Sequence, residues 1–256
     1  MKLATWNVNS IRARLPHVLD WLAANKPDAL CLQETKVVDA DFPYGPLRAL
    51  GYHVTHVGQR SYNGVATITR AAAGDIVRAP PGLDGEQKRA LTVTVDGIRV
   101  INVYVPNGER VGSEKYEFKL KWFAALRRYL AEELKHHRRL AITGDFNVAP
   151  EDRDVYDPRL WQNQVLFSEP ERKALRDMAD LGLIDVFRRF DQPPRSYTWW
   201  DYRQGGFRRN LGLRIDHILC SAELAKQCVA CHIDQAPRKR ERPSDHAPVV
   251  AEFRSV

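Results

Sequence analysis

The residues best able to do chemistry in this chain are carboxylates and amides placed just after short apolar runs. Glu34 follows the run Ala29–Gln33, and Asp145 and Asn147 follow the run Leu140–Thr143. Asp145 and Asn147 are two residues apart, so in an extended chain their side chains point to the same face. Oxygen-bearing groups are the ligands that Mg²⁺ prefers. A hard-metal site at strand ends is therefore the first chemistry that the sequence indicates.

A second group combines an acid in apolar surroundings with a histidine. Asp216 lies inside the apolar segment Leu213–Leu219, where a carboxylate needs a partner. His246 follows Asp245 just before the apolar run Val249–Phe253. A histidine beside carboxylates suits proton transfer or the stabilisation of a developing phosphate charge. Each residue alone is more typical of a turn or a helix cap, so their repetition at several strand ends is what favours catalysis.

The elements that must position these residues alternate between short apolar runs and helical patterns, which is typical of α/β layering. Asp96-Gly97 lies between two β-branched runs and predicts a two-residue hairpin, so the sheet structure should not be purely parallel. Strands are expected at Lys2–Trp6, Ala29–Gln33, Val65–Thr69, Ala90–Val95, Ile98–Tyr104, Leu140–Thr143, Leu213–Leu219 and Val249–Phe253.

Three helices are predicted between these strands. Apolar residues at helical spacing predict a helix over Ile11–Ala24. A long helix should follow Ser113 as its N-cap, and a third should begin at the capping box Ser168–Glu171 and end near Gly182. For the long helix we expect an apolar face made of Leu120, Phe123, Leu130 and Leu134, with lysines and arginines opposite.

The composition is that of a basic globular protein. The 256 residues carry a net charge of +7, which suits a polyanionic partner such as nucleic acid, although a merely basic surface would give the same number. No segment approaches the 18 apolar residues of a membrane span, and no linker or charge block divides the chain. We expect one domain over residues 1–256, located in the cytoplasm, with no obligate protein partner evident.

The four cysteines favour a reducing compartment over a disulfide framework. Cys31 and Cys220 lie inside apolar runs, where a buried thiol is expected. Cys228 and Cys231 form one CxxC pair, which is too few ligands for structural zinc. In an extended segment these two side chains would point to opposite faces.

Six fragments then make the chain recognisable. They are, in order, Thr5–Asn9, Leu32–Lys36, Asn102–Asn107, Gly144–Asn147, Leu213–His217 and Ser244–Pro248. As an ordered set they resemble the exonuclease–endonuclease–phosphatase superfamily, whereas any single fragment is a weak signal. Tyr197–Arg203 and Arg209–Asp216 look more specifically like the exonuclease III type of abasic-site endonuclease. The resemblance runs from Lys2 to Phe253.

The resemblance implies a fold and an activity. The fold would be a four-layer α/β sandwich of two mixed β-sheets packed face to face, with helices outside. The activity would be a Mg²⁺-dependent DNA phosphodiesterase of base-excision repair, with Mn²⁺ able to substitute. Such an enzyme incises double-stranded DNA 5′ to abasic sites, removes 3′ blocking groups and acts as a 3′→5′ exonuclease.

The resemblance also implies roles at matching positions. Glu34 would be the main Mg²⁺ ligand, with Asn7 and Asp245 nearby, and Asp145 would orient or deprotonate the attacking water. Asn147 would fix that water and the phosphate, while His246, held by Asp216, and Tyr104 would lie against the phosphate. For DNA binding, Trp199 would help to wall the pocket for an abasic sugar, and Arg89, Arg110 and Asn107 would contact the strand.

Other interpretations stay open at this stage. The arginines and aromatics between Arg188 and Arg209 favour a loop that tracks phosphates and stacks on bases. The less favoured alternative is that Trp199 and Trp200 are core and the arginines a solvated face. The basic run Pro237–Arg242 could touch DNA or be a solvated loop. Rival functions are a phosphoesterase for inositol phosphates or sphingolipid, and a DNA-binding module without catalysis.

Overall fold

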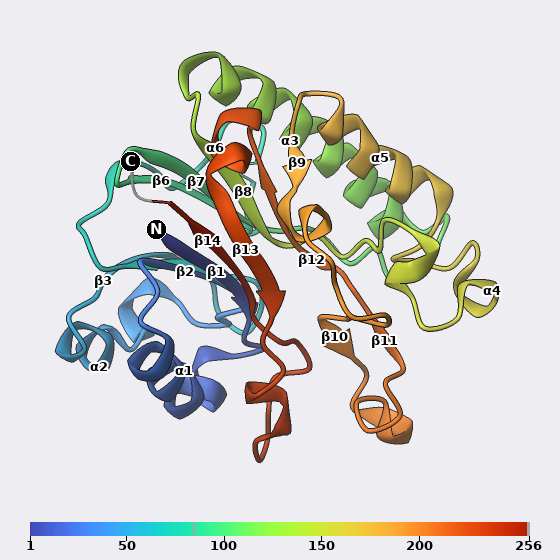
Figure 1. The fold of residues 1–256 in the computed structure, drawn as a ribbon, viewed down its shortest axis with the longest axis horizontal. Helices are drawn as coiled ribbons and strands as arrows, with labels where there is room; N and C mark the ends of the chain where they lie inside the picture. The colour runs from blue at the N-terminus through green and yellow to red at the C-terminus, as the bar shows by residue number, and fades with distance from the viewer. Residues whose placement is uncertain (84, 255–256) are drawn as a thin grey trace.

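Two six-stranded mixed β-sheets pack face to face in this protein, and helices lie on their outer faces (Figure 1). The computed structural model describes residues 1–83 and 85–254. The arrangement confirms the predicted four-layer α/β sandwich of two mixed sheets.

Each sheet has a parallel pair at its centre and antiparallel strands outside. The first sheet contains, in spatial order, β13 (Cys228–Ile233), β14 (Val249–Phe253), β1 (Lys2–Asn7), β2 (Ala29–Gln33), β4 (Val65–Thr69) and β3 (His53–Val57). The second contains β5 (Gly74–Val77), β6 (Ala90–Val95), β7 (Ile98–Tyr104), β8 (Leu140–Asp145), β12 (Asp216–Cys220) and β9 (Ile184–Asp185). A two-stranded ribbon, β10 (Trp199–Trp200) with β11 (Gly212–Leu213), belongs to neither sheet.

The helices divide between the two outer faces. Helices α1 (Ile11–Asn25) and α2 (Tyr44–Ala49) lie against the first sheet, whereas α3 (Glu114–His136) and α5 (Glu169–Ala179) cover the second (Figure 1). Short helices α4 (Pro158–Trp161) and α6 (Ala222–Gln227) complete the set, with 3₁₀ turns at Asp39–Asp41, Asp152–Asp154, Val186–Arg189, Arg203–Gly205 and Pro237–Lys239.

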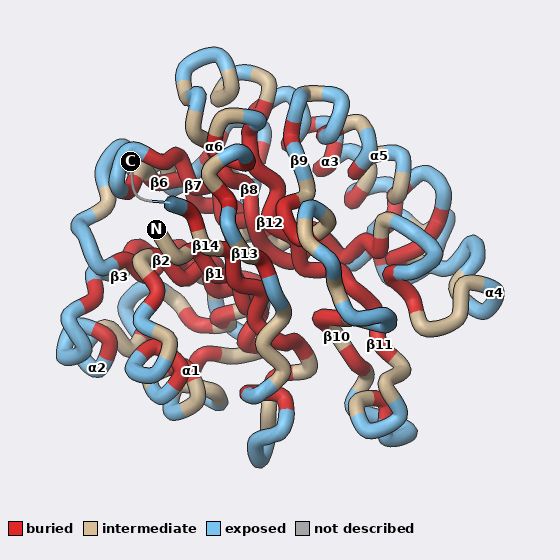
Figure 2. Tube along the Cα trace, in the orientation of Figure 1, coloured by how far each residue is buried: buried red, intermediate tan, exposed pale blue. Residues whose placement is uncertain are grey.

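Alternation along the strands explains why four layers form. In β1, Leu3 faces the core between the sheets, whereas Ala4 and Trp6 pack under the helices. In β2, Cys31 faces inward between Leu30 and Leu32, which face the helices. β1 and β2 are therefore buried on both faces, while the helices keep one exposed side (Figure 2).

The long helix α3 differs from its prediction in the face that it buries. Ser113 caps it as predicted, since its hydroxyl accepts the Tyr116 backbone N–H at 3.1 Å. The buried positions are Tyr116, Lys119, Trp122, Phe123, Ala125, Leu126, Tyr129 and Leu130, whereas Leu120 and Leu134 are only half-buried. The expectation that lysines lie opposite the apolar face is wrong for Lys119, which is fully buried. Across residues 1–83 and 85–254, no helix is long and apolar enough to cross a bilayer.

Most predicted strands have the expected bounds, but one is broken. The hairpin between β6 and β7 forms at Asp96-Gly97, both with positive φ, as a tight hairpin turn requires. The expected strand Leu213–Leu219 is divided into β11 and β12. The break falls at Arg214, whose buried guanidinium binds the carboxylates of Asp154 and Asp185 instead of continuing the apolar alternation.

All four cysteines are free and buried, as predicted for Cys31 and Cys220. The expectation that Cys228 and Cys231 point to opposite faces is wrong. A register shift between Cys228 and Ala230 in β13 adds a residue, so both thiols enter the core between the sheets.

Candidate active site

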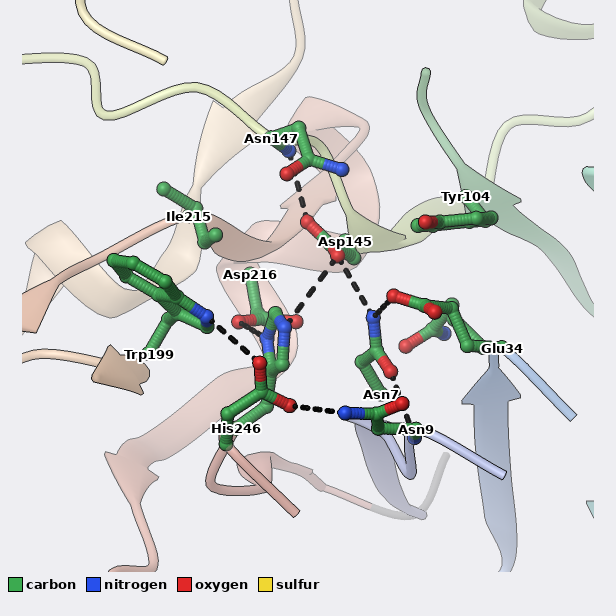
Figure 3. A network of polar contacts seen from close by, with 12 residues as sticks. Asn7, Asn9, Glu34, Tyr104, Asp145, Asn147, Trp199, Ile215, Asp216 and His246 are labelled. Carbon is green, nitrogen blue, oxygen red and sulfur yellow. Dashed lines mark hydrogen bonds and ion pairs between the residues drawn. The ribbon is translucent and has the colours of Figure 1, made fainter. Parts of the chain in front are cut away.

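Residues singled out from the sequence converge where the central strands of both sheets end (Figure 3). In the second sheet, Tyr104 ends β7, Asp145 ends β8 and Asp216 begins β12, and the strand register places the three side by side. In the first sheet, Asn7 ends β1 and Glu34 follows β2. Carboxyl ends of parallel strands meet at one edge of a sheet, so the fold itself gathers these groups.

Asn7 joins the two sheets through its side-chain amide. Its Nδ2 donates to Glu34 Oε1 at 2.8 Å and to Asp145 Oδ2 at 2.9 Å. Its Oδ1 accepts the backbone N–H of Asn9 at 3.0 Å. Asn7 thus presents its nitrogen, not its oxygen, to the two carboxylates, and its role as a metal ligand stays a prediction.

Asp145 is a buried acid whose pKa is raised. Burial raises the pKa of Asp145 to about 7, even though the His246 charge opposes that rise, and Asp216 adds to it. Its Oδ1 accepts the Asn147 backbone N–H at 2.9 Å. The expectation that Asp145 and Asn147 share a face of an extended strand is wrong, because Asn147 has φ 50° and the two residues meet through a tight turn.

His246 and Asp216 form the predicted pair. His246 Nδ1 lies 2.9 Å from Asp216 Oδ2, and both side chains are buried. Burial alone would lower the pKa of His246, but Asp216 and then Asp145 outweigh it and raise that pKa to about 10. His246 Nε2 also lies 3.7 Å from Asp145 Oδ2. The imidazole therefore holds a proton between two carboxylates.

Tyr104 lies beside Glu34 and Asp145, with Arg89 over its ring at 4.6 Å (Figure 3). Burial, followed by the charges of Glu34 and Asp145, raises the pKa of Tyr104 well above its usual value. The phenol therefore stays protonated and can donate a hydrogen bond. Arg89 Nη1 donates to the Tyr104 carbonyl at 3.2 Å, so Arg89 packs against the site as a half-buried side chain.

Glu34, Asp145 and His246 each place one potential ligand atom within 4.8 Å of the others. Two carboxylates this close favour a cation between them, and oxygen donors fit a hard divalent ion. His246 is a poor ligand here, because a doubly protonated imidazole offers no free lone pair. The donor that best fits a metal is therefore Glu34, with Asp145 facing it.

Asp245, the remaining predicted ligand, is linked to Glu34 through the side chains of Asn9 and Lys36. Asp245 Oδ1 accepts Asn9 Nδ2 at 3.0 Å, and its Oδ2 accepts Trp199 Nε1 at 3.0 Å. Lys36 Nζ lies 2.6 Å from Asn9 Oδ1 and 2.9 Å from Glu34 Oε2. Asn9 and Lys36 were not assigned from the sequence, although both belong to recognised fragments, and they connect Asp245 to Glu34.

Trp199 and Trp200 have different environments although they are adjacent. Trp200 is fully buried and packs against Phe207, with its Nε1 donating to Asn210 at 3.0 Å. Trp199 is half-buried and lines a cavity of about 270 Å³ with Tyr156, Trp161, Asp201, Arg203, Gln204, Gly206 and Leu211. The core interpretation therefore holds for Trp200, and a cavity wall describes Trp199.

The residues predicted to contact DNA lie around this site with different exposure. Asn107 and Arg110 are exposed on the loop after β7, and Asn107 Nδ2 donates to Asn147 Oδ1 at 3.3 Å. Asn107 and Arg89 also border a second cavity of about 620 Å³ that includes Tyr104. In the run Pro237–Arg242, Arg238 is buried between the rings of Tyr202 and Phe207, whereas Lys239 and Arg242 are exposed.

Residues 4–246 match the model of the endonuclease/exonuclease/phosphatase family. The chain belongs to this family. The match covers every polar strand end described above, from Asn7 to His246. The family shows the class of chemistry, a phosphoester hydrolase, and it agrees with the resemblance drawn from the ordered fragments.

Individual relatives are similar over their whole length. Exodeoxyribonuclease III of Haemophilus influenzae is 39% identical, with 99% of this chain and 100% of that protein covered. A 3′ phosphatase from Neisseria, solved with a product DNA hairpin, is 46% identical with a TM-score of 0.98, and both chains are covered completely. An abasic-site endonuclease from Archaeoglobus fulgidus is 42% identical with a TM-score of 0.96, again over 100% of both chains.

Proposed function

We propose that this chain is a Mg²⁺-dependent DNA phosphodiesterase of base-excision repair. It incises 5′ to abasic sites, removes 3′ blocking groups and degrades duplex DNA from 3′ ends. One observation carries the proposal: the Asn7–Glu34–Asp145 cluster meets the Asp216–His246 pair beside the aromatic cavity of Trp199. The similarity to exodeoxyribonuclease III and to abasic-site endonucleases supports the substrate class. Residues 1–256 would act as one domain, since both sheets supply the site.

Each side chain has a role that its surroundings support. Asp145 orients or deprotonates the attacking water, because a carboxylate with a pKa near 7 can both accept and hold a proton at working pH. Asn147 fixes that water and a phosphate oxygen. His246, kept cationic by Asp216, stabilises the charge on the scissile phosphate, and the Tyr104 hydroxyl donates to it.

The metal site that we propose centres on Glu34, with Asn7 and Asp245 nearby and Asp145 facing it. Mg²⁺ bound there, or Mn²⁺ in its place, would offset phosphate charge and lower the barrier to attack by water. Asn7 keeps Glu34 and Asp145 together through one amide group, which orients both carboxylates before substrate binds.

DNA binding draws on the basic and aromatic groups around the site. An abasic sugar is cheap to extrude from the helix, and a cavity with an aromatic wall such as Trp199 suits it. Arg110 is exposed next to the site, and Arg89 and Asn107 border the neighbouring cavity. The net charge of +7 favours the strand as a whole.

Side-by-side rates test the proposal. We expect cleavage of an abasic duplex, a 3′-phosphate nick and a recessed 3′ end, abolished by a chelator and restored by Mg²⁺. Inositol phosphates and sphingomyelin serve as rival substrates at matched concentration. Faster hydrolysis of either rival would overturn the DNA assignment. DNA binding without metal-dependent cleavage would indicate a non-catalytic module instead.

A further inference from the structure

Lys119 is a fully buried lysine that none of the roles above uses. It lies on the inner face of α3, and its Nζ makes three contacts, which satisfy its three donors. The ammonium donates to the Asn147 carbonyl at 2.7 Å, to the Asn107 carbonyl at 3.0 Å and to the carboxylate of Glu171. Two of its three partners are thus main-chain atoms of residues at the candidate site.

The counter-charge is equally buried and fixed. Glu171 has no exposed surface, and its oxygens accept the backbone N–H groups of Leu166 at 3.0 Å and Ser168 at 3.1 Å. Tyr116 in turn bonds the Ser168 hydroxyl at 2.6 Å. A buried ion pair typically contributes little net stability compared with apolar side chains of similar volume. Stability alone therefore gives no reason for an ammonium here.

What the ammonium holds is the shape of two loops. Asn107 follows β7 and Asn147 follows β8, the neighbouring parallel strands that end in Tyr104 and Asp145. Asn147 has φ 50°, a left-handed conformation that asparagine tolerates, and it forms the tight turn after β8. Its Nδ2 donates to the Val105 carbonyl at 3.0 Å and its N–H to Asp145 Oδ1, so the loop also touches the buried acid.

We propose that Lys119 is a positioning residue for the reaction, which fixes Asn147 and Asn107 by holding their carbonyls while Glu171 balances its charge. Lys119 does not touch substrate and acts only through the two asparagines. The inference rests on the proposed DNA phosphodiesterase activity. Catalytic groups displaced by about 1 Å can lose about 10²-fold in rate, so a loosened Asn147 should lower kcat.

A second, largely buried ion pair on the same helix provides a control. Arg99 at the start of β7 pairs with Glu133 near the end of α3, and their side chains are 4% and 15% exposed. This pair also ties β7 to α3, but at the end of the strand opposite to Tyr104. Its loss should therefore leave the two asparagines in place, whatever its effect on stability.

The experiment compares two double variants, Lys119→Met with Glu171→Gln and Arg99→Met with Glu133→Gln. On an abasic duplex at saturating Mg²⁺, we expect the first to lose at least ~10-fold in kcat with little change in KM. The control should retain wild-type kcat at any temperature where it is folded. Hydrogen exchange should rise at residues 105–110 and 146–149 in the first variant only.

Lys119→Arg keeps the charge pair and covers the case in which the double variant does not fold. Its planar fork cannot direct one nitrogen to three converging acceptors, so kcat should fall to an intermediate value. Full activity in Lys119→Arg and in any folded double variant, or equal losses in the control pair, would overturn the positioning role. An inactive wild-type protein would instead refute the proposed function.

Discussion

The two six-stranded sheets follow one plan but end in different side chains. Taken from β13 in one sheet and from β9 in the other, successive strands pair in the same pattern, with only the third pair parallel. In this pattern β1 corresponds to β8, β2 to β7 and β14 to β12. The ends of corresponding strands carry the site residues of both halves.

Corresponding ends meet as complementary pairs. Asn7 at the end of β1 donates to Asp145 at the end of β8, and His246 before β14 binds Asp216 at the start of β12. Glu34 after β2 lies beside Tyr104 at the end of β7. The repeated strand pattern thus brings corresponding strand ends together, and the different side chains at these ends provide the hydrogen-bond donors and acceptors.

The burial of the site carboxylates also differs between the halves. Asp145 and Asp216 of the second sheet are 1% exposed, whereas the side chain of Glu34 in the first retains 18%. A buried acid with a raised pKa suits proton handling, while an acid open to solvent can exchange a cation. Activity lost by replacing the acids of the second sheet should therefore not be restored by adding metal.

The strongest test of this division is Asp145→Asn. The variant keeps the size and some of the hydrogen bonds but cannot accept a proton. We expect a loss of about 10³-fold or more in single-turnover rate on an abasic duplex, within the range of one acid–base group. Because the loss is of proton handling, raising Mg²⁺ should not recover it. Recovery at high Mg²⁺ would assign Asp145 mainly to the metal.

The Asp216–His246 pair, which joins the two halves, should act as a unit. His246→Asn should lower the rate by about 10²-fold, because it removes a charge aimed at the phosphate. Asp216→Asn should also lower the rate, because Asp216 is the main cause of the raised pKa that keeps the His246 imidazole charged. The double variant should then lose less than the product of the single losses. Fully multiplicative losses would show that the two residues act independently.

In the first sheet, Glu34→Gln tests metal binding. It should raise the Mg²⁺ concentration for half-maximal rate by about 10-fold or more, and saturating metal should recover much of the activity. DNA binding in chelator, measured by fluorescence anisotropy, should be unchanged. Asp245→Asn is the matched comparison, since Asp245 reaches Glu34 only through Asn9 and Lys36, and its shift should be smaller. An unchanged Mg²⁺ titration in Glu34→Gln would remove its assignment as ligand.

The strands that hold these residues were predictable from alternation and turn chemistry. Ala29–Gln33 and the Asp96-Gly97 hairpin have the predicted bounds because local apolar runs and a positive-φ turn determine them. A partner for Asp216 was also expected, since a carboxylate among apolar residues needs one, but only the family resemblance named His246 as that partner. Local signals of this kind depend on few residues and survive folding unchanged.

Other features depend on contacts between distant segments. Lys119 is spaced with Tyr116, Phe123 and Leu126 on one helical face, so its position was detectable, but its partner Glu171 lies 52 residues away. The residue added to β13 that turns Cys228 inward is set by pairing with β14. Asn9 and Lys36 could be placed only once β1, β2 and the Asp245 loop were together.

The ribbon β10–β11 belongs to neither sheet, and it touches the site through the Trp199 Nε1 donation to Asp245 Oδ2. Trp199→Ala should remove a cavity wall and weaken abasic incision through both binding and rate, while 3′-phosphate removal is affected less. We expect a selectivity change of about 10-fold, which corresponds to about 1.4 kcal/mol and lies within the range of one stacking contact. Rates on the two substrates, beside thermal unfolding, measure it.

Trp200→Ala, at the neighbouring position, is the control for the Trp199→Ala experiment. Trp200 is fully buried, so its loss should lower the melting temperature. Every activity should then fall by the same factor, because less of the protein is folded. Trp199 is half-buried, so its variant should melt closer to the wild-type temperature. The salt dependence of DNA binding should stay nearly intact in Trp199→Ala, because that slope reports phosphate contacts, and it should fall in Arg110→Ala. A Trp199→Ala protein that is destabilised and loses both activities equally would mean that Trp199 is core and that the sugar pocket lies elsewhere.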